Sequence, residues 1–254
     1  MITESSNNQL EDMSNALPSS QWNHHNVLDL DNFSHTEITT VLSLADRMRE
    51  ILDRRIPRVP ALRGYTIVNL FFEPSTRTRA SFELAGKMLG ADVISVSAST
   101  SSVQKGESLI DTVRTLRAMR SDAIIIRHEM AGAPYLAASH TDASIINAGD
   151  GAHAHPTQAL LDLYTMQRHV GDLKNKKVVM VGDIAHSRVA RSDIWGLAKM
   201  GAHVVLCGPP TLLPRGLGIA ERPEHAKNAL PFVQIETDID NALEDAHVVM
   251  ALRL

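Results

Sequence analysis

Short apolar runs that alternate with helical periods constrain the fold of this chain more than any other feature. The run Thr66–Phe72 is β-branched and aromatic, as a buried strand should be, and Glu73-Pro74 ends it. Apolar residues at helical spacing follow directly behind Thr78 and stop at Gly90. The same succession recurs along the chain, and such alternation favours parallel sheets covered by helices. The sequence therefore predicts an α/β fold with two doubly wound parallel-sheet (Rossmann-like) domains.

The pattern also predicts where the elements and domains lie. We expect helices over 34–54, 78–90 and 107–120, one that starts at Pro156, and one that carries Ile194 and ends at Gly201. The expected strands lie at 66–72, 92–96, 123–127, 144–148, 177–183, 204–207, 232–235 and 248–252. Proline is tolerated in the first turn of a helix, so the helix from Pro156 can join two domains. The expected parts of the chain are a disordered tail over 1–20, a first domain over 21–155, a linking helix over 156–170 and a second domain over 171–254.

The composition narrows the class of protein. The chain has 254 residues, of which 44% are hydrophobic and 21% charged, so it can bury sizeable cores without disulfides. Its one cysteine, Cys207, fits a reducing compartment, and the net charge of −4 with no long basic block argues against nucleic acid as a partner. No apolar run approaches the roughly 20 residues of a membrane helix, and the N-terminus lacks the pattern of a signal peptide. We therefore expect a cytoplasmic chain without membrane or nucleic-acid partners.

The segment Ser75-Thr76-Arg77-Thr78-Arg79 stands where the first predicted strand gives way to a helix. Three hydroxyls and two guanidiniums gather there, and a helix N-terminus adds backbone N–H donors and partial positive charge. Charge-assisted hydrogen bonds of roughly 1.5–3 kcal/mol each would hold a phosphate without a metal. The alternative is a helix cap followed by two solvated arginines. Further residues must decide between a phosphate site and a helix cap.

Three such residues are Arg127, His155 and Gln158. Arg127 closes the third predicted strand, and the other two follow the fourth, so all should face one rim of the first sheet and converge on one pocket. A histidine can polarise a carbonyl oxygen and a glutamine amide oxygen can hold an NH₂ group, which suits a carbamoyl group. Alone, His155 could equally be a loop histidine or, with His153, half of a metal pair. No Cys, Asp or third His stands at ligand spacing nearby, which disfavours the metal reading.

Four segments together carry a resemblance to one enzyme family. In chain order they are Phe71–Arg79 (FFEPSTRTR), Gln104–Glu107 (QKGE), Asn147–Gly151 (NAGDG) and His155–Gln158 (HPTQ). With them the chain closely resembles the aspartate/ornithine carbamoyltransferase family over about residues 25–254. Four separate motifs in the right order are far more specific than any one of them. The resemblance implies that the first domain binds carbamoyl phosphate and that the second binds the amino-acid acceptor.

The second half of the chain points to aspartate as that acceptor. The segment Val181–Ser192 looks like the aspartate branch of the family, whose acceptor arginine matches Arg188, whereas the ornithine enzymes carry an asparagine-rich stretch there. Arg253 looks like the second acceptor arginine of that branch. A dicarboxylate amino acid suits guanidinium forks, which would repel a cationic one. The alternative is a pair of surface arginines on a Rossmann-like domain.

The resemblance implies carbamoyl transfer from carbamoyl phosphate to the amine of L-aspartate, a step of pyrimidine biosynthesis. The residues implied to bind the phosphate are Ser75, Thr76, Arg77, Thr78 and Arg127. Thr78, Arg127 and His155 would polarise the carbonyl group, Gln158 would hold the amino group, and Arg188 with Arg253 would orient aspartate. The implied catalytic residues are Arg77, Thr78, Arg127 and His155. The implied mechanism rests on orientation and preorganised charge, with no covalent intermediate, no cofactor and no metal.

Assembly is implied by two further matches. Ser101 and Lys105 match family residues that reach into the carbamoyl-phosphate site of a neighbouring subunit, where the lysine also contacts aspartate, so the resemblance implies an obligate homotrimer with shared active sites. From the residues alone, Lys105 could equally be a solvated loop charge. Family members are also found with regulatory or amidohydrolase-like partner chains.

The end of the chain departs from the family pattern. Family catalytic chains continue well past Arg253-Leu254, through a glutamine that follows the second acceptor arginine and a helix that returns to the first domain. We therefore expect a stripped or impaired site. The alternatives are a non-catalytic, carbamoyltransferase-like scaffold and a nucleotide-binding module, but Val181-Gly182-Asp183 lacks the G-x-G-x-x-G pattern that the latter needs.

Overall fold

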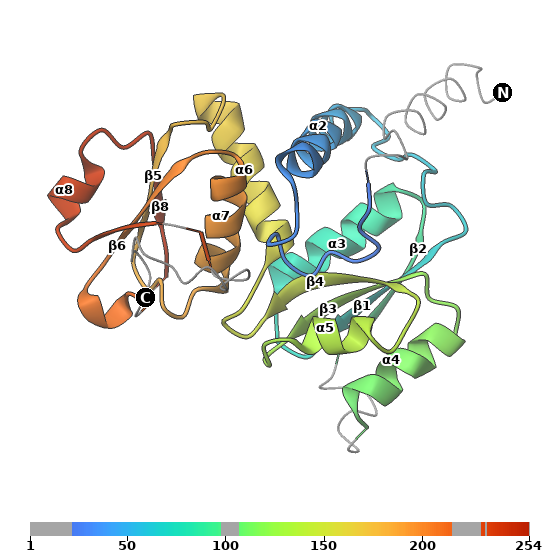
Figure 1. Cartoon of the computed structure of the whole chain (residues 1–254). Helices are drawn as coiled ribbons and strands as arrows, with labels where there is room; N and C mark the ends of the chain where they lie inside the picture. Colours follow the sequence, from blue (N-terminus) through green and yellow to red (C-terminus); the bar gives the residue numbers. More distant parts are fainter. Residues whose placement is uncertain (1–21, 98–106, 215–229, 232, 254) are drawn as a thin grey trace. The chain divides into compact units, whose positions relative to one another are not determined.

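The chain divides into two compact units. The computed structural model describes residues 22–97, 107–214, 230–231 and 233–253, shown in colour in Figure 1. One unit comprises Met1–Val27, Thr36–His128 and Ala133–Ile146, and the other comprises Leu28–His35, Glu129–Gly132 and Asn147–Leu254. The predicted disordered tail over 1–20 lies outside the described residues.

A four-stranded sheet forms the centre of the first unit, with the strand order β2-β1-β3-β4. The strands are β1 (Thr66–Phe71), β2 (Asp92–Ser97), β3 (Ala123–His128) and β4 (Ser144–Asp150). β1 runs parallel to both β2 and β3, and Leu70 and Ile126, which are paired between β1 and β3, are fully buried. The register also pairs Phe71 with Arg127. The carboxyl end of β3 therefore lies beside the segment that leaves β1.

Helices cover both faces of this sheet. They are α2 (His35–Leu52), α3 (Thr76–Met88), α4 (Leu109–Ala118) and α5 (Ala133–Ala138). Figure 1 shows α3 on one face and α4 with α5 on the other. A Cβ atom at Gly86 of α3 would lie 2.6 Å from Cγ2 of Val93, so only glycine lets α3 pack this closely on β2. This packing holds the N-terminus of α3 at the carboxyl edge of the sheet, where ligands of parallel sheets bind.

A second four-stranded sheet, ordered β7-β6-β5-β8, forms the other unit. Its strands are β5 (Lys177–Val181), β6 (His203–Cys207), β7 (Gln234–Glu236) and β8 (Val248–Ala251), and its helices are α6 (Pro156–Val170), α7 (Arg188–Lys199), the 3₁₀ turn η3 (Pro210–Leu212) and α8 (Ile239–Leu243). All the strands are parallel. Val179, Val205 and Ala242 share one buried cluster. A Cβ at Gly196 of α7 would lie 2.7 Å from Cδ1 of Leu163, so glycine allows α7 to pack closely on α6.

The predicted α/β class with two parallel sheets is confirmed. Sequence periodicity did not predict α5 and α8, because helices this short do not complete enough turns to show a period. The last strand but one was predicted over 232–235 and lies at Gln234–Glu236 instead.

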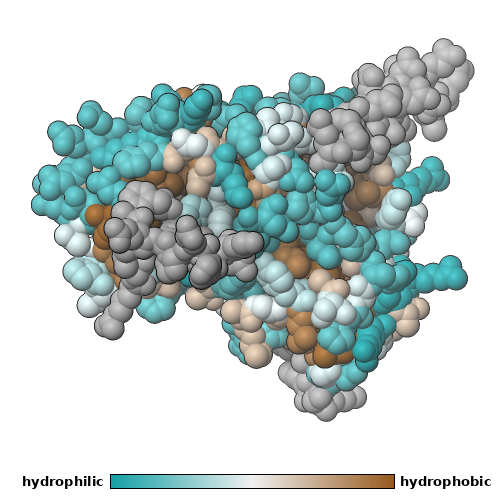
Figure 2. Space-filling view, in the orientation of Figure 1, coloured by the Kyte–Doolittle hydropathy of each residue, from teal (hydrophilic) through white to brown (hydrophobic). Residues whose placement is uncertain are grey.

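The helices and the surface can be compared with the prediction that the chain has no membrane partner. Among the described residues, no helix combines the length and the apolar character needed to cross a bilayer. Figure 2 shows hydrophilic residues over most of the visible face and exposed hydrophobic residues over α5, where Leu136 is 44% exposed. Isolated exposure of this kind is common on folded proteins.

Candidate functional site

The start of α3 in the first unit presents polar groups to solvent. Ser75 is the N-cap residue, with extended backbone angles (φ −158°, ψ 101°), and its hydroxyl makes no capping hydrogen bond. Thr76 and Arg77 are exposed, and the first turn of the helix holds no acidic residue. Because the first N–H groups of a helix lack partners within it, this end attracts an anion. Ser75–Thr78 together with Arg127 are called the cradle below.

Arg127 is held in place within the cradle. Its side chain is only 12% exposed and forks onto the carboxylate of Glu73, with Nε–Oε2 at 3.2 Å and Nη2–Oε1 at 3.3 Å. Its Nη1 donates to Oγ1 of Thr78 at 3.4 Å. A backbone hydrogen bond also holds this residue, since the N–H of Phe72 donates to the carbonyl of Arg127 at 2.9 Å. The guanidinium is therefore oriented before any ligand arrives.

A buried polar network fixes the loop between β4 and α6 in the second unit. Its centre is the carboxylate of Asp150, which is fully buried. Oδ1 accepts from Nδ2 of Asn147 at 2.8 Å and from the N–H of Ala154 at 3.0 Å, and Oδ2 accepts from the N–H of Gly132 at 2.7 Å. His153 contributes Nδ1, 3.1 Å from Oδ2. These residues are called the Asp150 network.

The charges of the network support one another. Burial raises the pKa of Asp150, but the hydrogen bonds from His153, Asn147 and Gly132 outweigh it and leave the pKa below its usual value. The hydrogen bond to Asp150 raises the pKa of His153 against the opposing effect of burial. From the sequence, we expected no Asp at ligand spacing near His153. In the structure, however, the carboxylate of Asp150 lies within hydrogen-bond distance of the His153 ring. Among the residues described, no three His, Cys, Asp or Glu side chains gather closely enough to hold a metal ion.

His155 follows the network and begins α6 as its N-cap residue, with Pro156 in the first turn. The residue is 6% exposed. Its backbone N–H donates to Oγ of Ser192 at 2.9 Å, and that hydroxyl donates to Oδ1 of Asp29 at 3.0 Å. Burial raises the pKa of Asp29, although hydrogen bonds from Leu30 and Ser192 oppose the shift. The chain of bonds anchors the backbone of His155 while its ring stays at the helix N-terminus.

Gly149 brings His155 and Arg188 to one place. Its φ is +113°, and a Cβ there would lie 2.9 Å from Nε of Arg188 and 3.3 Å from Cδ2 of His155. Arg188 opens α7, and its Nη1 donates to the carbonyl of Gly151 at 3.1 Å. The imidazole and the guanidinium thus flank the same backbone, which only glycine allows in this conformation.

The other predicted site residues of the second unit also lie near strand ends. Gln158 stands in the first turn of α6, and its Nε2 donates to Oδ1 of Asp162 at 3.0 Å. Arg253 is exposed and follows β8, where the N–H of Leu252 donates to the carbonyl of Val181 at 2.8 Å. That bond joins the carboxyl end of β8 to the end of β5, the strand that leads to Arg188. Ser101 and Lys105 lie outside the described residues.

The structure thus assembles two sets of predicted residues, one in each unit. Thr78 and Arg127 meet in the first, and His155 and Arg188 meet in the second. One pocket formed by both sets stays a prediction. Sequence reasoning missed the residues that hold these groups, namely Glu73, Asp29, Ser192, Asp150 and Asp162. Glu73 beside an arginine-rich segment was a usable signal, whereas Asp29 and Ser192 are too distant in sequence to suggest a pair.

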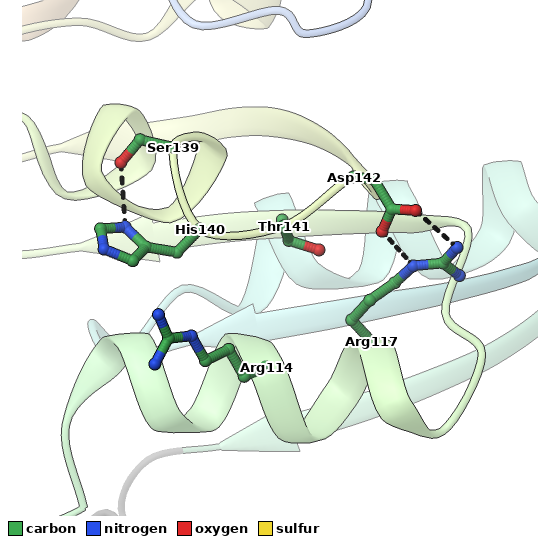
Figure 3. A pocket seen from close by; sticks show the side chains of 6 residues that line it. All are labelled: Arg114, Arg117, Ser139, His140, Thr141 and Asp142. Atoms are coloured by element: carbon green, nitrogen blue, oxygen red, sulfur yellow. Dashed lines mark hydrogen bonds and ion pairs between the residues drawn. The ribbon is translucent and has the colours of Figure 1, made fainter.

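A hollow in the first unit involves none of these residues. Figure 3 shows its lining, formed by Arg114, Arg117, Ser139, His140, Thr141 and Asp142. Arg117 forks onto Asp142, with Nη2–Oδ2 at 2.9 Å, and Oγ of Ser139 lies 2.9 Å from Nδ1 of His140. Asp142 neutralises Arg117, and the proposed chemistry makes no use of this open hollow.

Two parallel four-stranded sheets define this chain as a doubly wound α/β protein, a class that binds ligands at the carboxyl ends of its strands. The chain belongs to the aspartate/ornithine carbamoyltransferase family. Residues 25–168 match the carbamoyl-P binding domain of that family, and residues 174–254 match its Asp/Orn binding domain.

Relatives of known name agree with this assignment. The aspartate carbamoyltransferase catalytic subunit of Chloroflexus aurantiacus is 58% identical over 90% of this chain and 72% of the relative. That of Dehalococcoides mccartyi is 54% identical over 92% of this chain and 69% of the relative. Among solved structures, the catalytic subunit of M. jannaschii aspartate transcarbamoylase is 35% identical, with a TM-score of 0.74 over 90% of this chain and 73% of that one. Trypanosoma cruzi aspartate transcarbamoylase in complex with carbamoyl aspartate and phosphate has a TM-score of 0.76 at 29% identity, over 90% of this chain and 75% of that one.

Proposed function

We propose that this chain transfers the carbamoyl group of carbamoyl phosphate to the amine of L-aspartate, giving N-carbamoyl-L-aspartate and phosphate for pyrimidine biosynthesis. The named relatives and the product-bound Trypanosoma cruzi structure support the reaction. The observation that carries it in this chain is the cradle, where Arg127 is fixed by Glu73 and Thr78 beside an uncapped helix start. A preoriented cation at such a place suits a phosphate that must be bound and then released.

The cradle binds the phosphate end of the substrate. The hydroxyls of Ser75, Thr76 and Thr78 donate to its oxygens, and Arg77 and Arg127 supply charge-assisted bonds. The phosphate is also the leaving group, so charge grows on its bridging oxygen as the bond to carbon breaks. Donors fixed in advance stabilise this charge without reorganising during the reaction.

His155, Gln158 and the two acceptor arginines handle the rest of the reaction. With Thr78 and Arg127, His155 donates toward the carbonyl oxygen, and Gln158 accepts from the carbamoyl NH₂ group. Arg188 and Arg253 bind the two carboxylates of aspartate by guanidinium forks. The neutral amine attacks the carbonyl carbon to form a tetrahedral intermediate. Its collapse breaks the bond to the phosphate oxygen, and the proton that the amine nitrogen loses passes to the departing phosphate as the product forms.

The proposal extends to domains, assembly and location. The carbamoyl-phosphate-binding domain spans 21–155, a linking helix spans 156–170, and the aspartate-binding domain spans 171–254. The enzyme is a cytoplasmic homotrimer in which Ser101 and Lys105 complete the site of a neighbouring subunit.

The test is isothermal titration of the chain with a bisubstrate mimic that joins a phosphonate to aspartate, alongside an assay for N-carbamoyl-aspartate. We expect tight binding of the mimic, with release of one phosphate for each carbamoyl-aspartate formed. Binding of phosphate without turnover would contradict the catalytic proposal while leaving the cradle intact. Binding of neither ligand would favour the non-catalytic scaffold.

A further inference from the structure

Two carboxyl groups with buried oxygen atoms lie where α6 and α7 pack together. Asp193 of α7 is fully buried, and within the described part of the chain neither of its carboxyl oxygens has a hydrogen-bond partner. Oδ2 of Asp162, on α6, is likewise buried and unpartnered among the described residues. A buried carboxylate without partners is costly, and a second one nearby adds repulsion. The two are called the buried acid pair.

The pair reaches the proposed substrate site through one hydrogen bond. Nε2 of Gln158 donates to Oδ1 of Asp162 at 3.0 Å, one helical turn away on α6. Gln158 is the residue proposed above to hold the carbamoyl NH₂ group. Asp162 therefore accepts a hydrogen bond from the Nε2 end of an amide whose Oε1 end is proposed to face the ligand.

The environment separates the two acids. Burial raises the pKa of Asp193 well above its usual value, and the charge of Asp162, which faces it from α6, raises it further. Burial also raises the pKa of Asp162, to about 6, against the opposing hydrogen bond from Gln158. Asp162 has the lower barrier to ionisation of the two, because a hydrogen bond from Gln158 stabilises its carboxylate whereas Asp193 has no such partner among the described residues.

We propose that the carboxylate of Asp162, through its hydrogen bond from Nε2, sets which end of the Gln158 amide faces the ligand and so selects a carbamoyl NH₂ group. This inference rests on the proposed function. Asp162 is a positioning residue, because it acts through Gln158.

The selection follows from donor and acceptor chemistry. An ionised carboxylate only accepts hydrogen bonds, so Nε2 of Gln158 must face Asp162, which leaves Oε1 to accept from a ligand N–H. A protonated Asp162 can instead donate to Oε1, and the amide can then turn and present Nε2 to the ligand. Nε2 of Gln158 and the NH₂ group of the ligand, both hydrogen-bond donors, would then face each other. The preference for an amide ligand would be lost.

The experiment compares two ligands on the full chain by isothermal titration. Phosphonoacetamide carries both a phosphonate and an NH₂ group, whereas inorganic phosphate tests the cradle alone. For the unchanged chain, we expect the preference for phosphonoacetamide over phosphate to weaken as pH falls through about 6. The ligands themselves also titrate in this range. Because they do so equally for every variant, this contribution cancels when variants are compared at the same pH.

Three variants separate positioning from folding. Asp162→Leu should bind phosphonoacetamide about tenfold more weakly, the typical value of one lost hydrogen bond, with phosphate affinity unchanged. Asp162→Asn keeps the size of the side chain but cannot ionise, so its preference should be flat across the same pH range. Asp193→Asn keeps the size of the side chain and leaves the hydrogen bond between Gln158 and Asp162 in place, so it should keep both the preference and the pH midpoint of the unchanged chain. Thermal unfolding of each variant confirms that it is folded.

Several results would overturn the inference. Positioning through Gln158 would be excluded if Asp162→Leu kept the preference for phosphonoacetamide over phosphate. It would also be excluded if the affinities for both ligands fell equally. A midpoint retained in Asp162→Asn would assign the pH dependence to another group. A chain that binds neither phosphonoacetamide nor phosphate would instead overturn the proposed function itself, so the two failures are distinguishable.

Discussion

The cradle and the Asp150 network treat polar groups in opposite ways. In the cradle, the hydroxyl of Ser75 makes no capping bond, and Thr76 and Arg77 face solvent. In the network, the carboxylate of Asp150 is fully buried and accepts from Asn147, Ala154 and Gly132. Apart from Arg127, which donates to Glu73 and Thr78, the cradle keeps its donors available for a ligand, whereas the network uses its donors to hold its own backbone.

The difference separates binding from positioning. Exposed donors contribute little to the stability of the fold, so changes there should affect ligand affinity and turnover. Buried, fully bonded groups set the conformation of the loop that carries His155, so changes there should alter stability as well. The next three predictions test this separation, beginning with the largest effect.

Arg127→Ala should have the largest effect on activity. The change removes a fixed cation from the proposed phosphate and carbonyl contacts and leaves the carboxylate of Glu73 to repel the substrate. We expect kcat/KM for carbamoyl phosphate to fall about 10³-fold, the upper range for loss of one preorganised donor. Steady-state kinetics at saturating aspartate measure the loss.

A matched control for that variant is Arg58→Ala, because Arg58 is exposed and outside the cradle. It should keep kcat/KM within about twofold, as most surface substitutions do. If both arginine variants lose activity equally, the cradle is not the phosphate site.

Gly149→Ala should have a smaller effect that combines binding and stability. The new Cβ would meet Nε of Arg188 at 2.9 Å and Cδ2 of His155 at 3.3 Å, at a φ of +113° that side chains rarely adopt. Displacing both groups should reduce kcat/KM for aspartate about 10²-fold, since misplacement of about 1 Å has this cost. Kinetics at saturating carbamoyl phosphate and the thermal unfolding midpoint are the measurements.

Gly64→Ala separates backbone strain from displacement. Gly64 also has a positive φ, +86°, but a Cβ there meets nothing within 4 Å. It should lower the unfolding midpoint with little effect on the KM for aspartate. A Gly149→Ala variant that resembles Gly64→Ala in both measurements would exclude contact with Arg188 and His155 as the cause.

Asp150→Asn should have the smallest effect, mainly on stability. The folded pKa of Asp150 is lowered, so its contribution is present above the unfolded value of about 3.9 and is lost as pH falls through the folded pKa. The folded pKa of His153 is raised, so its contribution is present below about 6.5 and is lost as pH rises through the folded pKa. The variant should lose about 2 kcal/mol of unfolding free energy between these limits.

Denaturant unfolding across this pH range measures the loss. His153→Gln should remove only the decline at higher pH, because Asp150 keeps its other donors. A wild-type pH profile in Asp150→Asn would contradict the role given to the network.

Much of the fold could be predicted because it follows from local patterns. The apolar run at Thr66–Phe71 and the helix behind it need only neighbouring residues to be recognised, and Pro156 marks a helix start by its fixed φ. The candidate residue Arg127 was predictable because ligands bind at strand ends in such folds, whereas Arg188 was predicted only from its match to the acceptor arginine of the family. The short elements α5, β7 and α8 were missed or misplaced, since their stability comes from packing rather than from a repeating pattern.

By itself, the sequence determined the α/β class, the order of the longer strands and helices along the chain, and the family. Each follows from residues close together in the chain or from motifs in a set order. Only the tertiary structure decided that Glu73 holds Arg127 and that Gly149 stands beside both His155 and Arg188. It also decided that carboxyl oxygens of Asp162 and Asp193 are buried where α6 and α7 pack. The reason is physical: burial and hydrogen bonding between distant residues depend on how elements pack, which local periodicity does not report.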